Sequence, residues 1–265
     1  MTYWRYWQLN SAPFSSDSAL FRGATVEEGL ARIEFLIGNR RGVGSLLGAS
    51  GVGKTSLLKH CAANPPAGAG IPNLEVMRIS MLGMAPGELL CDVATRLLGG
   101  RRVPDAQGAW KTLCDYFQAA SREGTQAVLL VDDTESCSAA AEADLTRLLA
   151  MSFPLTVIFA VESQLASAVS RNLFERSELQ IELPGWETTQ TAEFLAWACQ
   201  SLGRSSPIFT DTAVERIQQL SFGIARRIVQ LADLALVAGA VAQADFIDAE
   251  CIEQVALELP KSTAA

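Results

Sequence analysis

The chain has 265 residues, of which 49% are hydrophobic and 19% charged. This length and composition suit a folded protein with a substantial core and exclude a chain that is mainly disordered. The formal net charge is −8, and no run of lysine and arginine is longer than two residues. Because non-specific nucleic-acid binding depends on positive charge that neutralises phosphates, the composition does not indicate it.

The cysteines and the termini indicate a compartment. The six cysteines are widely spaced without a C-x-x-C pair, and His60 is the single histidine, which favours small buried thiols over a zinc site. The first residues lack the pattern of a secretory signal, and the apolar residues 231–244 are interrupted by Asp233 and too few to span a bilayer. The sequence therefore predicts a soluble, cytoplasmic protein.

The first two thirds of the chain alternate between helical and strand patterns. Thr25 precedes two glutamates and a helical spacing of apolar residues that ends at Gly38. Later helices are expected over residues 86–99 and 109–124, and from Thr55. Strands are expected over residues 42–48, 74–80, 127–133, 153–161 and 178–184. Apolar, β-branched runs between helices are typical of a parallel sheet covered on both faces.

The strand pattern stops near residue 188. Four helical stretches follow, over residues 188–203, 210–221, 222–240 and 243–258. We therefore predict an α/β fold with a parallel sheet core and a small C-terminal helical domain. The expected divisions are an N-terminal aromatic segment and leading helix packed on the core (1–40), the core (41–186) and the helical domain (187–265).

Residues 48–55, "GASGVGKT", match the phosphate-binding loop G-x-x-x-x-G-K-[ST] between a strand and a helix. Its glycines let backbone N–H groups converge on a polyphosphate, and the helix N-terminus adds a positive dipole. Lys54 is expected to neutralise phosphate oxygens and Thr55 to ligate Mg²⁺. The predicted nucleotide contacts are Gly48, Ser50, Gly51, Val52, Gly53, Lys54, Thr55 and Ser56.

"AVLLVDDTES" at residues 127–136 places two acids at the end of a buried strand, roughly eighty residues after the phosphate loop. P-loop proteins hold their Mg²⁺ with an aspartate at such a strand end. Asp132 is therefore predicted as a metal-site residue together with Thr55, and ATP and Mg²⁺ as the cofactors. The alternative for Asp132 is an ordinary aspartate in a turn.

The whole pattern resembles the AAA+ ATPases, and within them the general secretion pathway protein A (ExeA-like) branch and the related MuB/TniB-type transposition ATPases. The residues that carry the resemblance are "YWQLNSAPF" (6–14), "LFRGATVEEGLARIEFLI" (20–37), the phosphate loop, "LLVDDTES" (129–136) and "FGIARRIVQLADLAL" (222–236). The resemblance covers nearly the full chain. It implies a P-loop NTPase (AAA+) fold, in which a small helical lid domain follows the α/β core, and an ATPase that acts as an oligomer.

The resemblance also assigns arginines. Arg226 in "GIAR" is expected to reach the γ-phosphate from the lid, as a second-sensor residue and a nucleotide contact. Arg171 or Arg176 is expected to be the arginine finger presented to a neighbouring subunit, where it stabilises charge in the transition state. Each of these arginines has an ordinary surface role as its alternative.

Two positions depart from the family pattern. Asp133 stands where the family usually has the glutamate that orients the attacking water, and a carboxylate displaced by about 1 Å costs on the order of a hundredfold in rate. We therefore expect binding to survive and hydrolysis to be slow. Glu162 falls at the usual place of a neutral first-sensor residue, so Ser163 or Gln164 remains open for that role.

The aromatic segment "YWRYWQLNSAPF" at residues 3–14 has two interpretations. Trp4, Tyr6, Trp7 and Phe14 cover the core and the nucleotide base, or they stack on nucleic acid or a protein partner. The acidic composition disfavours nucleic acid.

Three functions follow from the sequence. The first is an ATPase that hydrolyses ATP in a homo-oligomer to drive or regulate assembly of a secretion-type complex, cytoplasmic or peripheral at the inner face of the membrane. The second is an ATP-gated assembly switch with little hydrolysis. The third is an ATP-dependent, DNA-binding transposition regulator, which the net charge of −8 does not favour.

Overall fold

The computed structural model describes residues 2–14, 19–65, 71 and 73–260. Its contacts group the chain into two units. The α/β unit consists of Glu28–Ser50 and Lys54–Leu183, and the helical unit of Met1–Glu27, Gly51–Gly53 and Pro184–Ala265. Each unit has its own hydrophobic cluster of buried side chains.

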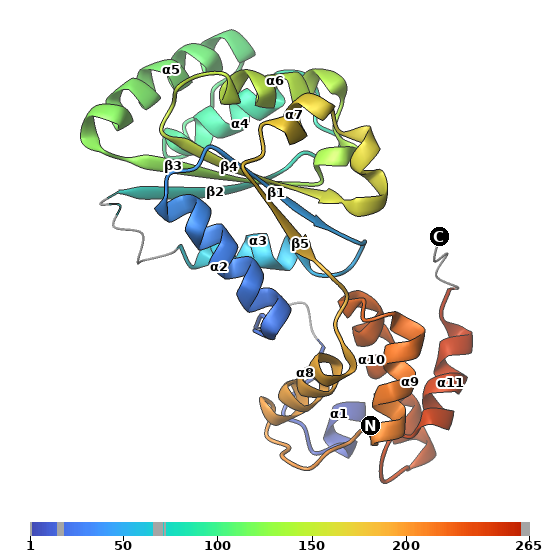
Figure 1. The fold of residues 1–265 in the computed structure, drawn as a ribbon. Coiled ribbons are helices and arrows are strands. Elements are labelled where there is room, and N and C mark those ends of the chain that lie inside the picture. The colour runs from blue at the N-terminus through green and yellow to red at the C-terminus, as the bar shows by residue number, and fades with distance from the viewer. Residues whose placement is uncertain (1, 15–18, 66–70, 72, 261–265) are drawn as a thin grey trace. The chain divides into compact units, whose positions relative to one another are not determined.

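A parallel sheet of five strands forms the centre of the α/β unit (Figure 1). Its strands are β1 (Val43–Gly48), β2 (Leu74–Ser80), β3 (Gln126–Asp132), β4 (Leu155–Glu162) and β5 (Leu179–Leu183), in the spatial order β2-β3-β4-β1-β5. Every residue of β1 and β3 is buried, as in strands covered on both faces, whereas β2 and β5 form the edges. The predicted P-loop NTPase fold is confirmed.

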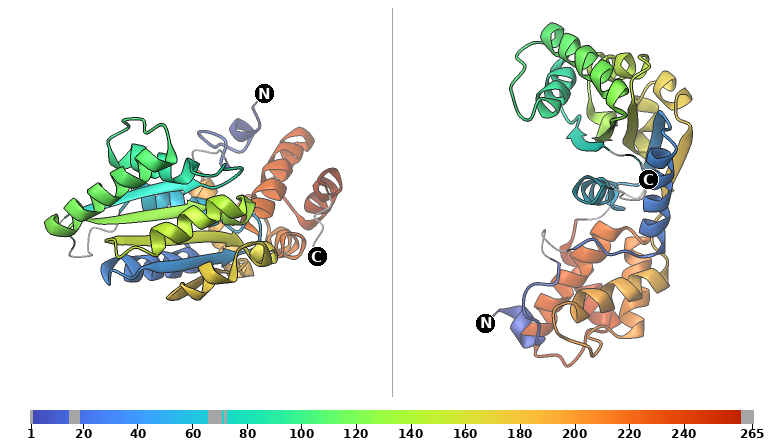
Figure 2. Two further views of the ribbon diagram at one scale, coloured as in Figure 1. Left: turned by 90° about the horizontal axis from the view of Figure 1, so that it is seen from above. Right: turned by 90° about the vertical axis from the view of Figure 1, so that its left-hand side faces the viewer.

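Helices cover both faces of this sheet (Figures 1 and 2). α2 (Ala24–Gly38) and α3 (Lys54–Ala63) lie on one face, and α4 (Glu88–Leu97), α5 (Ala106–Glu123), α6 (Ala139–Leu149) and α7 (Arg171–Glu175) on the other. Phe117 of α5 and Phe159 of β4 belong to the cluster on the second face, and both are fully buried. The sequence pattern did not indicate α6 or α7, and α7 has only five residues, too few for a helical period to be recognised.

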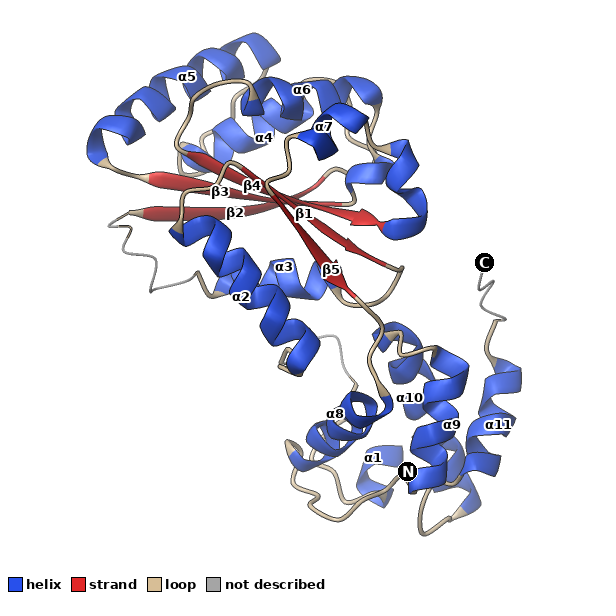
Figure 3. Ribbon diagram, in the orientation of Figure 1, coloured by secondary structure: helices blue, strands red, loops and turns tan. Residues whose placement is uncertain are grey.

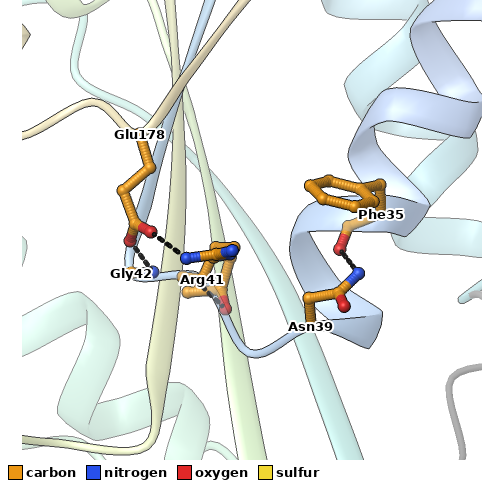
Figure 4. A network of polar contacts seen from close by, with 6 residues as sticks. Phe35, Asn39, Arg41, Gly42 and Glu178 are labelled. Carbon is orange, nitrogen blue, oxygen red and sulfur yellow. Dashed lines mark hydrogen bonds and ion pairs between the residues drawn. The ribbon is translucent and has the colours of Figure 1, made fainter.

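Polar contacts join the residues just before β1 to the residue just before the edge strand β5 (Figure 4). The Glu178 carboxylate accepts hydrogen bonds from the Gly42 backbone at 2.6 Å and from the Arg41 guanidinium at 3.2 Å. Asn39, just after α2, donates to the Phe35 carbonyl at 2.8 Å. These bonds hold the residues before β5 beside the start of β1.

The helical unit contains α1 (Tyr3–Tyr6), α8 (Thr188–Gln200), α9 (Asp211–Ser221), α10 (Ala225–Ala242) and α11 (Ala249–Glu258) (Figure 3). All four predicted C-terminal helices are present. Thr210 and Asp248 cap α9 and α11 by accepting hydrogen bonds from backbone N–H groups of the first turn, which explains where these helices begin. None of the helices among the described residues has the length and apolar character needed to cross a membrane.

The aromatic segment that we expected on the α/β core belongs to the helical unit. Trp7 is 1% exposed, donates from Nε1 to the Leu236 carbonyl at 2.8 Å and lies against Gly239 of α10. Tyr3 and Tyr6 donate hydrogen bonds to Asp233 and to the Ala244 carbonyl. The hydrophobic effect and these bonds secure the segment to α10, so the Trp7 ring is unavailable for stacking on a nucleic acid.

Candidate functional site

The strands of the α/β unit place several predicted site residues at one edge of the sheet. β1 ends at Gly48, β3 at Asp132 and β4 at Glu162, and the register pairs Gly48 with Glu162 and Ser80 of β2 with Asp132. Because all five strands are parallel, their carboxyl ends share the edge at which α/β proteins bind ligands. The start of the phosphate loop and the two acids at the end of β3, Asp132 and Asp133, therefore lie at the carboxyl ends of the strands.

The phosphate loop has the backbone that its glycines permit. Gly51 and Gly53 have φ angles of +82° and +113°, which residues with a side chain rarely adopt. Lys54 begins α3, and its ammonium donates to the Gly48 carbonyl at 2.7 Å and to the Ala49 carbonyl at 3.0 Å. Its charge is thus held beside the loop, next to the N-terminus of a ten-residue helix.

The hydroxyls of Thr55 and Ser56 follow in the first turn of α3, and both residues are exposed. Oxygen atoms of hydroxyl and carboxylate groups are the ligands that Mg²⁺ prefers, and the ion usually keeps several waters and takes phosphate oxygens besides one or two protein groups. Thr55 and Asp132 therefore fit the metal that a phosphate loop implies. Within the described ranges, no group of three or more acidic, cysteine or histidine side chains is arranged to hold a metal by itself.

Asp132 is buried beside an arginine. Its side chain is 3% exposed, and Oδ2 lies 3.3 Å from a guanidinium nitrogen of Arg78 on β2. Its backbone carbonyl accepts a hydrogen bond from the Met81 N–H at 2.9 Å. Two strands therefore hold this carboxylate at the sheet edge, and its negative charge is compensated within the protein.

Asp133 has a strained backbone and a partner on the same neighbouring strand. Its φ and ψ angles of +55° and +38° lie in the left-handed region, which is uncommon outside glycine. The Ser80 hydroxyl donates to Asp133 Oδ2 at 2.6 Å. The turn after β3 therefore directs the second carboxylate toward the end of β2, where Ser80 fixes its orientation.

The sequence did not indicate Arg78 and Ser80 as site residues. Both stand in the alternating strand "LEVMRIS", two residues apart, and so point to the same face of β2. The two-residue alternation of side chains in this strand is visible in the sequence. It points to the acidic residues only because the strand order places β2 beside β3.

Arg226 lies at the start of α10, in the same unit as the tip of the phosphate loop. The backbone N–H of Arg226 donates to the Gly51 carbonyl at 3.0 Å, and a Cβ added at Gly51 would lie 2.8 Å from the Arg226 Cβ. A glycine is therefore required at this point, both for the positive φ and for the close approach of α10.

The remaining predicted residues are on the surface of the α/β unit. Arg171 begins α7 and forms an ion pair with Glu175, and Arg176 follows the helix and donates to Asn172 at 3.2 Å. Ser163 and Gln164 are exposed in the 3₁₀ helix that follows β4. All four side chains are exposed.

Comparison with protein families matches the AAA domain over residues 37–169, about half of the chain. The chain belongs to the AAA domain family. The matched region begins within α2 and ends just after the 3₁₀ helix that follows β4, so it contains the phosphate loop and both acids. No curated protein matches the sequence.

Solved structures share the AAA+ fold at low identity. The Aeropyrum pernix ORC2 protein has a TM-score of 0.69 and 16% identity, over 97% of this chain and 72% of that chain. Drosophila ORC bound to DNA has a TM-score of 0.66 and 20% identity, over 92% of this chain and 63% of that chain. Thermotoga maritima RuvB, a Holliday junction branch migration motor, has a TM-score of 0.56 and 18% identity, over 93% of this chain and 72% of that chain. The α/β core and the C-terminal helical region are therefore common to proteins of divergent sequence.

Proposed function

We propose that this AAA+ protein binds ATP with Mg²⁺ at the phosphate loop and hydrolyses it in a homo-oligomer. The observation that carries the proposal is the phosphate loop between β1 and α3, at the sheet edge where β3 ends in Asp132. An amine, a hydroxyl and a carboxylate at these positions are the groups that phosphoryl transfer uses.

Each residue has a specific task in this proposal. The loop N–H groups and Lys54 bind the phosphates, and Thr55 and Asp132 hold the Mg²⁺, which supplies electrostatic stabilisation of the developing charge. Asp133 orients the attacking water and accepts its proton. Arg226 contacts the γ-phosphate, and Arg176 or Arg171 reaches the site of a neighbouring subunit, so hydrolysis depends on assembly.

The resemblance to the ExeA-like branch suggests the biological setting. We infer that nucleotide-dependent assembly drives or regulates a membrane-associated, secretion-type complex, with the protein in the cytoplasm or at the inner membrane face. For this role we keep the divisions 41–186 for the ATPase core and 187–265 for the lid.

An ATP-gated switch with little hydrolysis is the second candidate. The specific observation in its favour is Asp133, whose side chain is one methylene shorter than the glutamate usual in the family and whose carboxylate accepts a hydrogen bond from Ser80. Both features hold the carboxylate close to the strand end. A switch of this kind changes its assembly when ATP binds and turns over very slowly.

Likeness to ORC bound to DNA makes ATP-dependent DNA binding a third candidate. The net charge of −8 and the burial of Trp7 oppose it. Retention of DNA that needs ATP and weakens with salt is the observation that favours this candidate over the first two.

The decisive experiment measures ATP affinity, assembly state and phosphate release for the wild-type protein beside Lys54→Ala. If the protein is an ATPase, the wild type should release phosphate much faster than Lys54→Ala, and only in the assembled state. If the wild type binds ATP and assembles but releases phosphate no faster than Lys54→Ala, the protein is a switch. Failure of the wild type to bind ATP contradicts both.

A further inference from the structure

The ion pair between Arg78 and Asp132 is unusual in its placement. Asp132 is the acid assigned to the metal site, and its carboxylate already has a fixed cation 3.3 Å away. The Arg78 side chain is 28% exposed, whereas that of Asp132 is 3% exposed. The arginine therefore reaches from the outer part of β2 to a carboxylate that is almost completely removed from water.

A guanidinium at this distance changes what the carboxylate attracts. A free divalent cation that approaches Asp132 meets a site whose negative charge is already compensated, and it is repelled by the arginine at short range through a medium of low dielectric constant. A cation that arrives with a polyphosphate brings negative charge of its own. The pair therefore weakens binding of the free ion much more than binding of the nucleotide complex.

The surroundings of Arg78 give its side chain somewhere to move. Arg78 lines an open hollow along the outer edge of β2, together with Glu75 of the same strand and Arg96 and Leu97 of α4. Because β2 is an edge strand, no further strand closes this side of the sheet. A rotation of the Arg78 side chain into the hollow would separate the guanidinium from Asp132.

We propose that Arg78 is a positioning residue that makes metal binding depend on nucleotide. It holds Asp132 in a neutral ion pair against free Mg²⁺ and releases it when the ion enters with ATP. This inference rests on the proposed ATP and Mg²⁺ site, and it adds the regulation of that site by a residue outside the phosphate loop and the acidic pair.

Metal binding without nucleotide tests the proposal. Mn²⁺ is titrated into the full chain in the absence of nucleotide, and the free ion is measured by electron paramagnetic resonance. Arg78→Gln should bind Mn²⁺ at least about tenfold more tightly than the wild type, because one opposing charge has been removed. Arg78→Lys, which keeps the charge, should resemble the wild type, and the double variant Arg78→Gln/Asp132→Asn should lose the gain.

Arg96→Gln is the matched control, because Arg96 lines the same hollow but forms its ion pair with Asp92, at 3.1 Å. It should leave Mn²⁺ affinity unchanged. Equal affinity of the wild type and Arg78→Gln overturns the proposal, as does an equal gain in Arg96→Gln, which would show only a general effect of net charge.

A measurement on the wild type covers the case in which Arg78→Gln does not fold. The Nε–H resonance of Arg78, assigned with Arg78→Lys, should shift when a non-hydrolysable ATP analogue is added with Mg²⁺ and stay in place when the analogue is added with a chelator. A resonance that moves in neither condition, while the analogue binds in both, overturns the proposal. Absence of analogue binding contradicts the proposed function instead, and the Mn²⁺ titration then tests Arg78 separately wherever Arg78→Gln folds.

Discussion

Ser80 of β2 and Asp133, the residue after β3, are joined by a hydrogen bond of 2.6 Å. This bond crosses between adjacent parallel strands and ends at a residue in the left-handed backbone conformation. A hydroxyl that donates to a charged acceptor stabilises by about 1.5–3 kcal/mol, and in this case it also selects one orientation of the carboxylate. The same hydrogen bond therefore stabilises the fold and orients the Asp133 carboxylate.

Ser80→Ala should therefore reduce the free energy of unfolding by about 1–2 kcal/mol, measured by urea denaturation. Affinity for ATP with Mg²⁺ should stay within about twofold of wild type, since no nucleotide contact is assigned to Ser80. Ser80→Thr keeps the hydroxyl and should retain most of the stability. An alanine variant as stable as the wild type would show that the hydrogen bond contributes little.

Substitutions of Asp133 distinguish the ATPase from the switch by their effect on ATP turnover. Asp133→Glu restores the longer side chain usual in the family and should raise ATP turnover on the order of tenfold, because the carboxylate reaches further toward the γ-phosphate. Asp133→Asn cannot accept the water's proton and should fall to the Lys54→Ala rate. Phosphate release in the assembled state measures both, and equal rates for the wild type, Glu and Asn variants would exclude Asp133 from hydrolysis.

Gly51→Ala should be harmful for two reasons. The positive φ of +82° costs a residue with a side chain about 1 kcal/mol, and the new Cβ would lie 2.8 Å from the Arg226 Cβ. Gly124→Ala is the matched control, because its φ is +72° but its added Cβ meets nothing within 4 Å. We expect Gly51→Ala to lose more stability than the control in thermal melts and to weaken ATP binding, whereas the control should bind ATP normally.

Trp7→Ala should destabilise the helical unit by about 3–5 kcal/mol, because it leaves a cavity at a fully buried position and removes the hydrogen bond from the indole to the Leu236 carbonyl. Trp4→Ala is the control from the same segment, where the side chain is only partly buried. Urea denaturation followed by far-ultraviolet circular dichroism measures the difference. Equal losses for the two variants would contradict the placement of Trp7.

The buried thiols predict a dependence on pH. Burial raises the pKa of the Cys199 thiol from 9.0 to about 11, and burial with the nearby Glu34 charge raises that of Cys61 to about 12. In the native protein both should react slowly with iodoacetamide at pH 8, because about one molecule in a thousand or fewer carries the thiolate. Mass spectrometry of pulse-labelled protein checks this, with denatured protein as the control.

The same shifts determine a direction for stability. A thiol whose pKa is raised by folding stays protonated in the native state while the unfolded chain loses its proton, so the unfolded state gains from alkaline conditions. The contribution of Cys199 should be complete below about pH 9 and decline as pH rises toward 11. Cys199→Ala should show a weaker alkaline loss of unfolding free energy than the wild type.

Local patterns determined much of this protein from its sequence. The phosphate loop, the five strands and the four C-terminal helices are encoded by spacing over fewer than twenty residues, because glycine conformation, strand alternation and helical periodicity act between near neighbours. The apolar run before Asp132 likewise predicts that the aspartate stands at the end of a strand, since a buried strand stops where its apolar residues stop.

Only the tertiary structure decided which distant residues meet. The strand order places β2 beside β3, and therefore Arg78 against Asp132 and Ser80 against Asp133, residues more than fifty positions apart. Trp7 likewise belongs with α10 because Gly239 leaves room for its ring. Such contacts depend on the packing of whole elements, which no local pattern specifies, and they determine how the acids of the proposed site are held.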